Sequence, residues 1–467
     1  MSIRELWPAS LPLMLPILLL AACGDDPAVL EPVDREFIAA AVAANPVNAI
    51  SAEVTVSAVG YESVQVRARR DGEAAQVTPP VPFNGDTTVA AAVLGLHSES
   101  DYSFEVVLNV GAAQDAVDTL EFTTGALPDW LPSPTGAGAA PSPGYVTLSL
   151  ALGPAIADNT GRIVWYLGSP DSVLTNFQAH PDGTYTVFGR GDEGPYRVYD
   201  ELGRRIDLLG CVGWESTRFH EVRVMAEGDY WVLCDETTIE DLTQYGGGAA
   251  VEFDWTVLQH ISADRSLLWE WKASDHFEIT DQGTDGFPTA DRVNMTHGNA
   301  IAFDTDGNIL LSFRNLNEIT KIDAQSGDVI WRFGGGLQNE FTFVGDPKGS
   351  IERQHGLRVV EPGVIQLMDN GEQPPSRLVR YRIDERAMTA TLVFEYTHAS
   401  GVYSRVGGGT DVMPGGGGLV AFGRGGVVAE VSEAGQQVWE LLGLDNLYVF
   451  RAQRLPSLYA SERREQD

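Results

Sequence analysis

The chain has 467 residues and a formal net charge of −34, from 65 acidic and 31 basic residues. So acidic a surface repels nucleic acid and anionic lipid, which excludes nucleic acid as a partner, and we attribute the charge to solubility. Hydrophobic residues at 43% suffice for a sizeable core, and 50 glycines with 25 prolines favour short strands and turns over long helices.

The N-terminus predicts export. Residues 1–22 combine Arg4, an apolar run over 11–20 and the sequence Leu-Ala-Ala before Cys23, and are predicted to be a signal peptide. This cleavage sequence resembles a bacterial lipobox, which would make Cys23 the lipidated first residue of the mature chain; the alternative is an ordinary signal peptide with a chance cysteine. We expect an exported protein, lipid-anchored to a bacterial membrane and facing the periplasm or the cell surface. Residues 23–45, acidic and then Ala-rich, predict a lipidated tether with a short helix.

Residues 46–125 alternate between apolar and polar side chains, as short strands do, and their length suits a seven-stranded β-sandwich. Leu94-Gly95-Leu96 followed by Tyr102 resembles the tyrosine corner of fibronectin type III modules. The sandwich holds no catalytic cluster, so spacing, docking or homodimer formation are the roles left to it. Residues 126–144 contain five prolines and predict a linker, or a strap over the next domain.

A repeat occupies residues 145–460. Each copy has a turn followed by a strand with Trp or Phe, at 161–165, 265–269, 327–331, 390–394 and 435–439, with a weaker copy at 204–208. Such copies predict an all-β fold, a six-bladed β-propeller, with seven blades as the alternative. We expect residues 448–458 to pair beside the strands of 145–166, so that both ends of the domain close the ring.

Two cysteines remain after Cys23. Cys211 and Cys234 flank His220, on what are predicted to be adjacent strands. Outside the cytoplasm such a pair is more often bridged than free, so a disulfide beside His220 is the favoured interpretation. Two cysteines this far apart are a poor metal signal.

Four histidines stand at the starts of predicted inner strands: His180, His220, His297 and His355. Equivalent positions in different blades converge on the central channel. One such histidine is usually structural, but four in register favour a site, with His180 the weakest member because it precedes a surface-type Pro-Asp-Gly turn. Arg314 ends the strand next to that of His297.

Two stretches, 296–314 and 354–371, resemble the bacterial aryl-sulfate sulfotransferases. The first has Thr-His-Gly-Asn, then Asp-Gly-Asn and a strand ending in Arg; the second has Gln-His, then Met-Asp-Asn-Gly. The similarity extends over the whole predicted propeller. It implies transfer of a sulfuryl group from a phenolic sulfate donor to a phenolic acceptor, with ping-pong kinetics, through a sulfohistidine and without a nucleotide donor or other cofactor.

The resemblance also implies site roles. His355 matches the nucleophile, and His220, His297 and Arg314 match groups that hold the sulfuryl oxygens. Two further residues match substrate-binding positions. One is Asn299, and the other is Thr410, the nearest match to a lysine-threonine contact that the family has late in its chain. The chain departs from the family at Asn294-Met295, where Asp-Trp is frequent. The chemistry is coherent, because a sulfuryl group needs fixed positive donors around its oxygens and neutral imidazole is a good nucleophile.

Two other functions stay open. Three imidazoles at one channel mouth could bind Zn²⁺ or Cu²⁺ in a metal-dependent hydrolase or lyase, although Arg314 beside a metal would be costly unless an anionic substrate bridged them. A non-catalytic surface propeller that binds a partner is the other, since fold does not fix function. We predict no metal in the site.

Overall fold

The computed structural model describes residues 34–151, 153–168, 174–189 and 195–464. The predicted signal peptide, Cys23 and the first part of the tether lie outside these residues. Strands dominate what is described. The helical segments are η1 (Thr243–Tyr245), η2 (Ala273–Asp275), η3 (Phe287–Thr289), η4 (Arg314–Leu316) and α1 (Ala460–Arg464). None of the helices in the described ranges has the length and apolar character to cross a bilayer.

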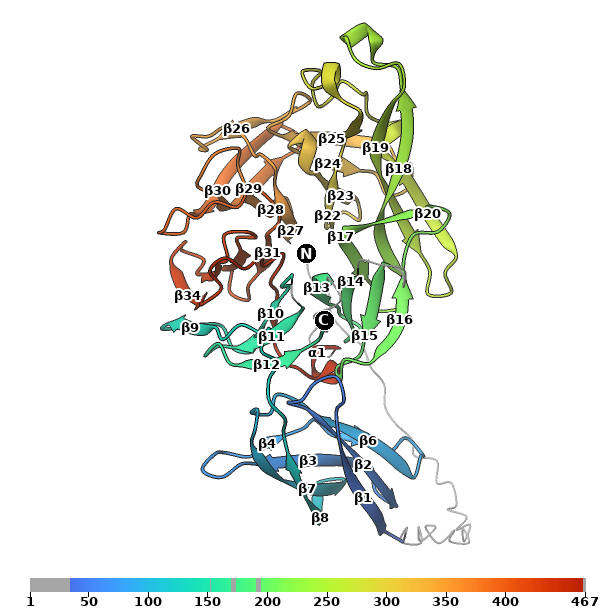
Figure 1. Ribbon diagram of the computed structural model, residues 1–467, viewed down its shortest axis with the longest axis vertical. Coiled ribbons are helices and arrows are strands. Elements are labelled where there is room, and N and C mark those ends of the chain that lie inside the picture. The colour runs from blue at the N-terminus through green and yellow to red at the C-terminus, as the bar shows by residue number, and fades with distance from the viewer. Residues whose placement is uncertain (1–33, 152, 169–173, 190–194, 465–467) are drawn as a thin grey trace, which may run out of the picture.

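Two antiparallel sheets form the N-terminal part of the chain (Figure 1). One has the order β1-β2-β6 and the other the order β4-β3-β7-β8, with β5 beside β3. Their strands are β1 (Glu36–Ala44), β2 (Ala52–Val59), β3 (Ser63–Arg69), β4 (Gln76–Val77), β5 (Val81–Pro82), β6 (Thr88–Val93), β7 (Asp101–Val110) and β8 (Ala113–Thr123). Apolar side chains from both sheets share one core. The hydroxyl of Tyr102 accepts a hydrogen bond from the backbone N–H of His97 at 2.8 Å, as in a tyrosine corner.

The prediction of a tether with a short helix was wrong for residues 36–44, which form the edge strand β1 against β2. Phe37, Ala40 and Val42 pack against the sandwich core. A register shift between Phe37 and Ala39 breaks the period-two pattern, and a run of alanines hides what remains of it. Sheet pairing and core contact outweigh the modest helix propensity of alanine here.

Six sheets follow in chain order around a common centre (Figure 1). Their strands pair antiparallel except for β21 with β19 and β26 with β30, which are parallel. The first three contain β10 (Tyr145–Leu148), β11 (Ala155–Asp158), β12 (Ile163–Tyr166) and β35 (Arg454–Leu455); β13 (Leu174–Ala179), β14 (Tyr185–Gly189), β15 (Tyr196–Tyr199) and β16 (Arg205–Leu209); and β17 (Ser216–Val224), β18 (Tyr230–Glu240), β19 (Val251–Ile261) and β20 (Leu267–Lys272), with β21 (Arg292–Asn294) beside β19.

The last three contain β22 (Gly298–Phe303), β23 (Ile309–Phe313), β24 (Glu318–Ile322) and β25 (Val329–Gly334); β26 (Thr342–Val344), β27 (His355–Glu361), β28 (Val364–Asp369), β29 (Arg377–Asp384) and β30 (Thr389–Tyr396); and β31 (Gly409–Val412), β32 (Gly418–Ala421), β33 (Val428–Val431), β34 (Gln437–Leu442) and β9 (Thr135–Gly138). The Trp- or Phe-containing copies of the repeat fall on the last strands of their sheets, for example Trp331 on β25 and Trp439 on β34.

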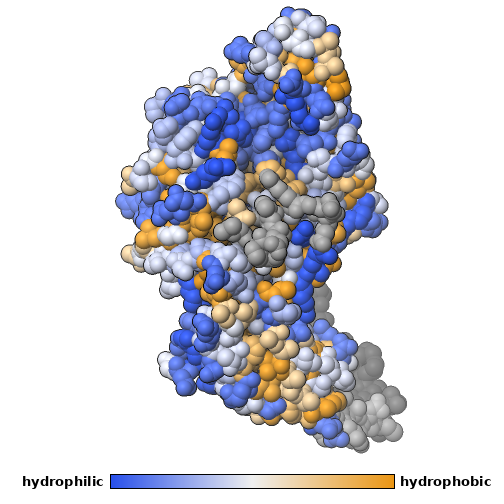
Figure 2. Space-filling model, viewed as in Figure 1, coloured by the Kyte–Doolittle hydropathy of each residue, from blue (hydrophilic) through white to orange (hydrophobic). Residues whose placement is uncertain are grey.

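Both ends of this region meet in one sheet. β10 pairs with β35, and Leu150 forms a bridge with Val449. Part of the Pro-rich segment also joins the sheets, because β9 pairs with β34 and so acts as a strap. The strands β10, β13, β17, β22, β27 and β31 contact one another in succession, which brings the start of each sheet toward the centre. Figure 2 shows a mainly hydrophilic surface at the top of this region, in keeping with the acidic composition.

Candidate active site

Four of the predicted site residues line one cavity of about 430 Å³: His220, His297, Arg314 and His355. They come from three consecutive sheets, on β17, just before β22, just after β23 and at the start of β27. His220 and His355 are buried, each 3% exposed. Within the described part of the chain no carboxylate lines this cavity, so its charged groups are cationic.

The strands that carry these histidines are bulged where the histidines lie. The ladder register shifts between Thr217 and Val222 in β17, between Gly298 and Ala300 in β22, and from His355 onward in β27. A β-bulge bends a strand and re-aims its side chains. The bulges therefore explain how side chains from three separate ladders converge on one cavity.

The proton of His355 is confined to one ring nitrogen. Its Nδ1 lies 2.9 Å from the carbonyl oxygen of Arg353 and 2.8 Å from Oδ1 of Asn370. The amide of Asn370 is itself fixed, because its Nδ2 donates to the carbonyls of Ser404 and Gly407. Two acceptors at Nδ1 require the N–H there. The lone pair of Nε2 is therefore free for chemistry.

The other two predicted site residues hold the backbone around His355. Asn299 donates from Nδ2 to the carbonyl of Gln354 at 2.7 Å, and Thr410 donates from Oγ1 to the carbonyl of Gly356 at 2.8 Å. Both are buried, and neither is among the described residues that line the cavity. Gly356 has φ +63°, and a Cβ there would meet the backbone N of Thr410 at 2.5 Å. Asn299 and Thr410 thus position the histidine strand and do not contact the cavity.

His297 and His220 share a hydrogen bond, with 3.1 Å between their Nε2 atoms. Nδ2 of Asn294 lies 2.9 Å from Nδ1 of His297 and donates to it, which leaves the proton of His297 on Nε2. His220 then accepts. Its own Nδ1 is buried and has no hydrogen-bond partner in the described ranges.

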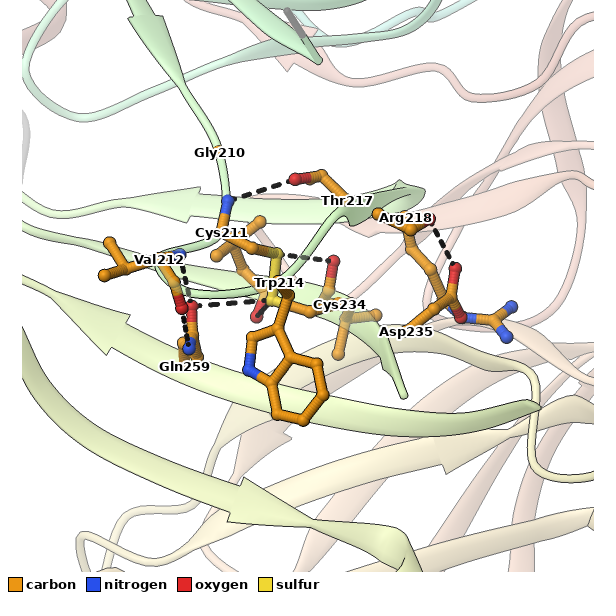
Figure 3. Close-up of a disulfide and its surroundings, with 12 residues drawn as sticks. Gly210, Cys211, Val212, Trp214, Thr217, Arg218, Cys234, Asp235 and Gln259 are labelled. Carbon is orange, nitrogen blue, oxygen red and sulfur yellow. Dashed lines mark hydrogen bonds and ion pairs between the residues drawn. A yellow bond between two sulfur atoms is a disulfide. The ribbon is translucent and has the colours of Figure 1, made fainter. Parts of the chain in front are cut away.

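A disulfide links the loop before β17 to β18. Cys211 and Cys234, the pair that the sequence marks as a bridge, are joined in the structure, as Figure 3 shows. On β17 and β18, Arg218 forms an ion pair with Asp235 and donates to Oδ1 of Asn294. The disulfide therefore lies beside the strand that carries Arg218, and Arg218 orients Asn294, the partner of His297.

Arg314 is 9% exposed, and no carboxylate forms an ion pair with it in the described part of the chain. It donates from Nη1 to Oδ1 of Asn315 at 2.8 Å and from Nη2 to the carbonyl of Arg405 at 3.4 Å. Burial lowers its pKa to about 10, and the charge of Arg353 acts in the same direction. At neutral pH the guanidinium remains a cation without a bound counter-charge, as an anion site requires.

The three histidines are neutral near pH 7. Burial lowers the pKa of His355 to about 4 and that of His297 to about 2, and it lowers the pKa of His220 well below its usual value. Nearby cations reinforce the effect of burial for each of them. Neutral imidazole is the nucleophilic form.

Sequence reasoning missed one wall of the cavity, which is aromatic and carries a second cation. Phe219, Tyr448, Phe450 and Arg424 line it. Phe219 precedes His220 and was within reach of the sequence argument. Arg424 lies in the loop between β32 and β33, and Tyr448 and Phe450 lie between β34 and β35, outside any recognisable motif.

The remaining histidine in register, His180, does not join the group. Its Nε2 lies 2.6 Å from Oγ1 of Thr186, a structural contact. The three cavity imidazoles also do not converge as a metal triad. Within the described ranges the one convergent set of three ligand groups is Asp304, Asp306 and Glu385, and the ammonium of Lys321 forms ion pairs with all three.

Comparison with known proteins finds one family whose model matches this chain. The arylsulfotransferase (ASST) family model matches residues 214–444, which include His220, His297, Arg314 and His355. No curated protein has a matching sequence.

Three solved structures resemble the chain at low identity. A Bacteroides caccae protein of unknown function is 13% identical with a TM-score of 0.43, over 68% of this chain and 100% of that one. A gluconolactonase from Xanthomonas campestris is 12% identical with a TM-score of 0.36, over 66% and 89%. The virginiamycin B lyase of Staphylococcus aureus is 12% identical with a TM-score of 0.30, over 81% and 99%. Likenesses of this size carry no argument about function.

Proposed function

The chain belongs to the arylsulfotransferase family, and we propose that it moves a sulfuryl group from a phenolic sulfate ester to a phenolic acceptor through a sulfohistidine on His355. The observation that carries the proposal is the protonation of His355. Both acceptors, the Arg353 carbonyl and Asn370, face Nδ1, so Nε2 offers its lone pair in a cavity lined by Arg314.

In the first half-reaction Nε2 of His355 attacks the sulfur. The new N–S bond forms as the S–O bond to the aryl group breaks, and the phenolate leaves with the electron pair. The sulfuryl oxygens carry the negative charge, and Arg314 is the fixed donor for them. The Nε2–H of His297, which donates to His220 in the free protein, becomes a second donor when that hydrogen bond breaks. A His220 proton that moves from the unpartnered Nδ1 to Nε2 supplies a third donor.

In the second half-reaction the acceptor phenol attacks the same sulfur. The N–S bond breaks, its electron pair returns to Nε2 of His355, and the phenolic proton passes to solvent. Sulfation makes the ring of His355 cationic, and the two acceptors at Nδ1–H stabilise that charge. Because donor and acceptor use one site in turn, ping-pong kinetics follow.

The wider architecture belongs to the same proposal. The six sheets form a closed six-bladed propeller, with β35 and β10 closing the ring, and β1 to β8 form a fibronectin type III-like sandwich. The lipidated Cys23 anchors the exported chain to a bacterial membrane facing the periplasm or the cell surface. Homodimer formation through the sandwich is part of this proposal as well.

A transfer assay tests the function. 4-Nitrophenyl sulfate with phenol should release 4-nitrophenol and form phenyl sulfate, and the double-reciprocal lines at several phenol concentrations should be parallel. His355→Ala should abolish transfer. His398→Ala is the matched control, because this histidine bonds to Ser400 and Glu440 away from the cavity. Full transfer by His355→Ala would refute the proposed nucleophile.

A further inference from the structure

Arg424 is a cation that neither the fold nor the proposed chemistry uses. It lies between β32 and β33, lines the same cavity as His355, and its side chain is exposed. Its backbone N–H donates to Oγ of Ser404, whereas its guanidinium has no hydrogen bond or ion pair within the described residues. The group lies over the ring of Tyr448, 5.8 Å from the ring centroid.

An unbroken row of aromatic rings connects the sulfuryl end of the cavity with Arg424. Phe219 stacks on His220 with centroids 4.0 Å apart. Phe450 follows at 5.7 Å from Phe219, and Tyr448 at 6.0 Å from Phe450. An aryl group that packs on these rings has its sulfate ester at the histidine end, and its far end points toward Arg424.

The far end of the row is fixed in place. A Cβ on Gly407 would approach the Tyr448 hydroxyl to 2.1 Å, so this edge of the ring abuts the backbone of Gly407. Gly407 in turn accepts a hydrogen bond from Asn370, the partner of His355. The ring that supports Arg424 is thus built into the same framework as the nucleophile.

We propose that the aryl substrate carries a second anionic group, a carboxylate, on the side of the ring opposite the sulfate ester, and that Arg424 binds it. The inference rests on the proposed function. A planar guanidinium matches a carboxylate with two parallel hydrogen bonds, and Arg314 already serves the sulfuryl end. In a chain of net charge −34, a cavity with two arginines and, among the described lining residues, no carboxylate selects for a substrate with two negative groups.

The test compares two donors that differ at one group, 4-(sulfooxy)benzoate and its methyl ester. Arg424→Ala should lower kcat/KM for the carboxylate donor by about 10- to 100-fold and leave that for the methyl ester within about twofold. Arg424→Lys keeps the charge without the fork and should fall between. Arg386→Ala, an exposed arginine in the turn between β29 and β30, is the charge-matched control and should leave both values unchanged.

Salt gives a second measurement. Because Arg424 is exposed, the wild-type preference for the carboxylate donor should shrink as ionic strength rises, since the methyl ester keeps only the charge of its sulfate and responds less to salt. Equal losses for both donors in Arg424→Ala, or no loss for either, would overturn the inference. If wild type transfers from the methyl ester and Arg424 proves irrelevant, the proposed function stands and the inference falls. If neither donor is turned over, both fall.

Discussion

Nδ2 of Asn294 lies 2.9 Å from Nδ1 of His297 and donates a hydrogen bond to it. The orientation of the amide follows from its other contact, because the Arg218 guanidinium can only donate and therefore takes Oδ1 at 3.3 Å. The proton of His297 is thus held on Nε2, toward His220. With a pKa of about 2, His297 is a neutral hydrogen-bond donor and not an acid at neutral pH.

Asn294→Asp should reverse this arrangement. A carboxylate accepts a hydrogen bond from Nδ1–H and favours the charged imidazolium, so the pKa of His297 should rise from its depressed value. NMR titration of the His297 ring in the variant and in wild type measures the change. An unshifted titration would show that Asn294 does not control the protonation of His297.

Asn370 should act on the rate through the proton of His355. Asn370→Ala removes one of two acceptors at Nδ1, and we expect sulfuryl transfer to slow by about 10- to 100-fold, as for other supporting contacts. Asn370→Asp keeps an acceptor but loses both donor contacts, to the carbonyls of Ser404 and Gly407.

Both variants should therefore be less stable than wild type, but only Asn370→Ala should be slow in transfer. Single-turnover transfer and thermal unfolding measured on both separate the roles. If Asn370→Asp is as slow as Asn370→Ala at equal stability, the contact is structural and does not fix the proton.

Stability should fall on mild acidification. The usual histidine pKa of 6.5 is lowered to about 4 for His355, so between these values the unfolded chain binds more protons than the folded one. Stability therefore rises with pH in this window and is lost as pH falls from about 6.5 to 4. Denaturant unfolding at several pH values measures the slope. His355→Gln should make the slope shallower without abolishing it, because the pKa values of His220 and His297 are lowered as well. An unchanged slope in that variant would contradict the neutral state of the folded histidine.

The disulfide should brace the loop that leads into β17, the strand that carries His220 and Arg218. Cys211 and Cys234 are 23 residues apart, and removing a bridge of this loop length costs about 2–4 kcal/mol in the chain-entropy estimate. The double variant Cys211→Ala and Cys234→Ala, compared with wild type in denaturant unfolding, measures this. Reductant should destabilise wild type and leave the double variant unchanged. Equal stability of both proteins without reductant would contradict the brace.

The sequence predicts those features of the structure that short-range residue patterns determine. Turn residues and Trp-containing strands mark the sheets, and His297 and His355 lie at the starts of inner strands as predicted. The prediction was wrong in placing His220 at a strand start, since it lies in the middle of β17. The sequence does not reveal Asn370 or Arg424 as partners of the cavity, since long-range pairing and bulges decide which distant side chains meet. Residues 36–44 show the same limit, because their strand character comes from pairing with β2.

The most direct test of the account is mass spectrometry of the enzyme mixed with 4-nitrophenyl sulfate and no acceptor. The account predicts a sulfuryl adduct on the peptide that contains His355, formed together with one equivalent of 4-nitrophenol and discharged when phenol is added. His355→Ala should show neither adduct nor burst. Transfer to phenol without an adduct, or an adduct on a peptide other than that of His355, would contradict it.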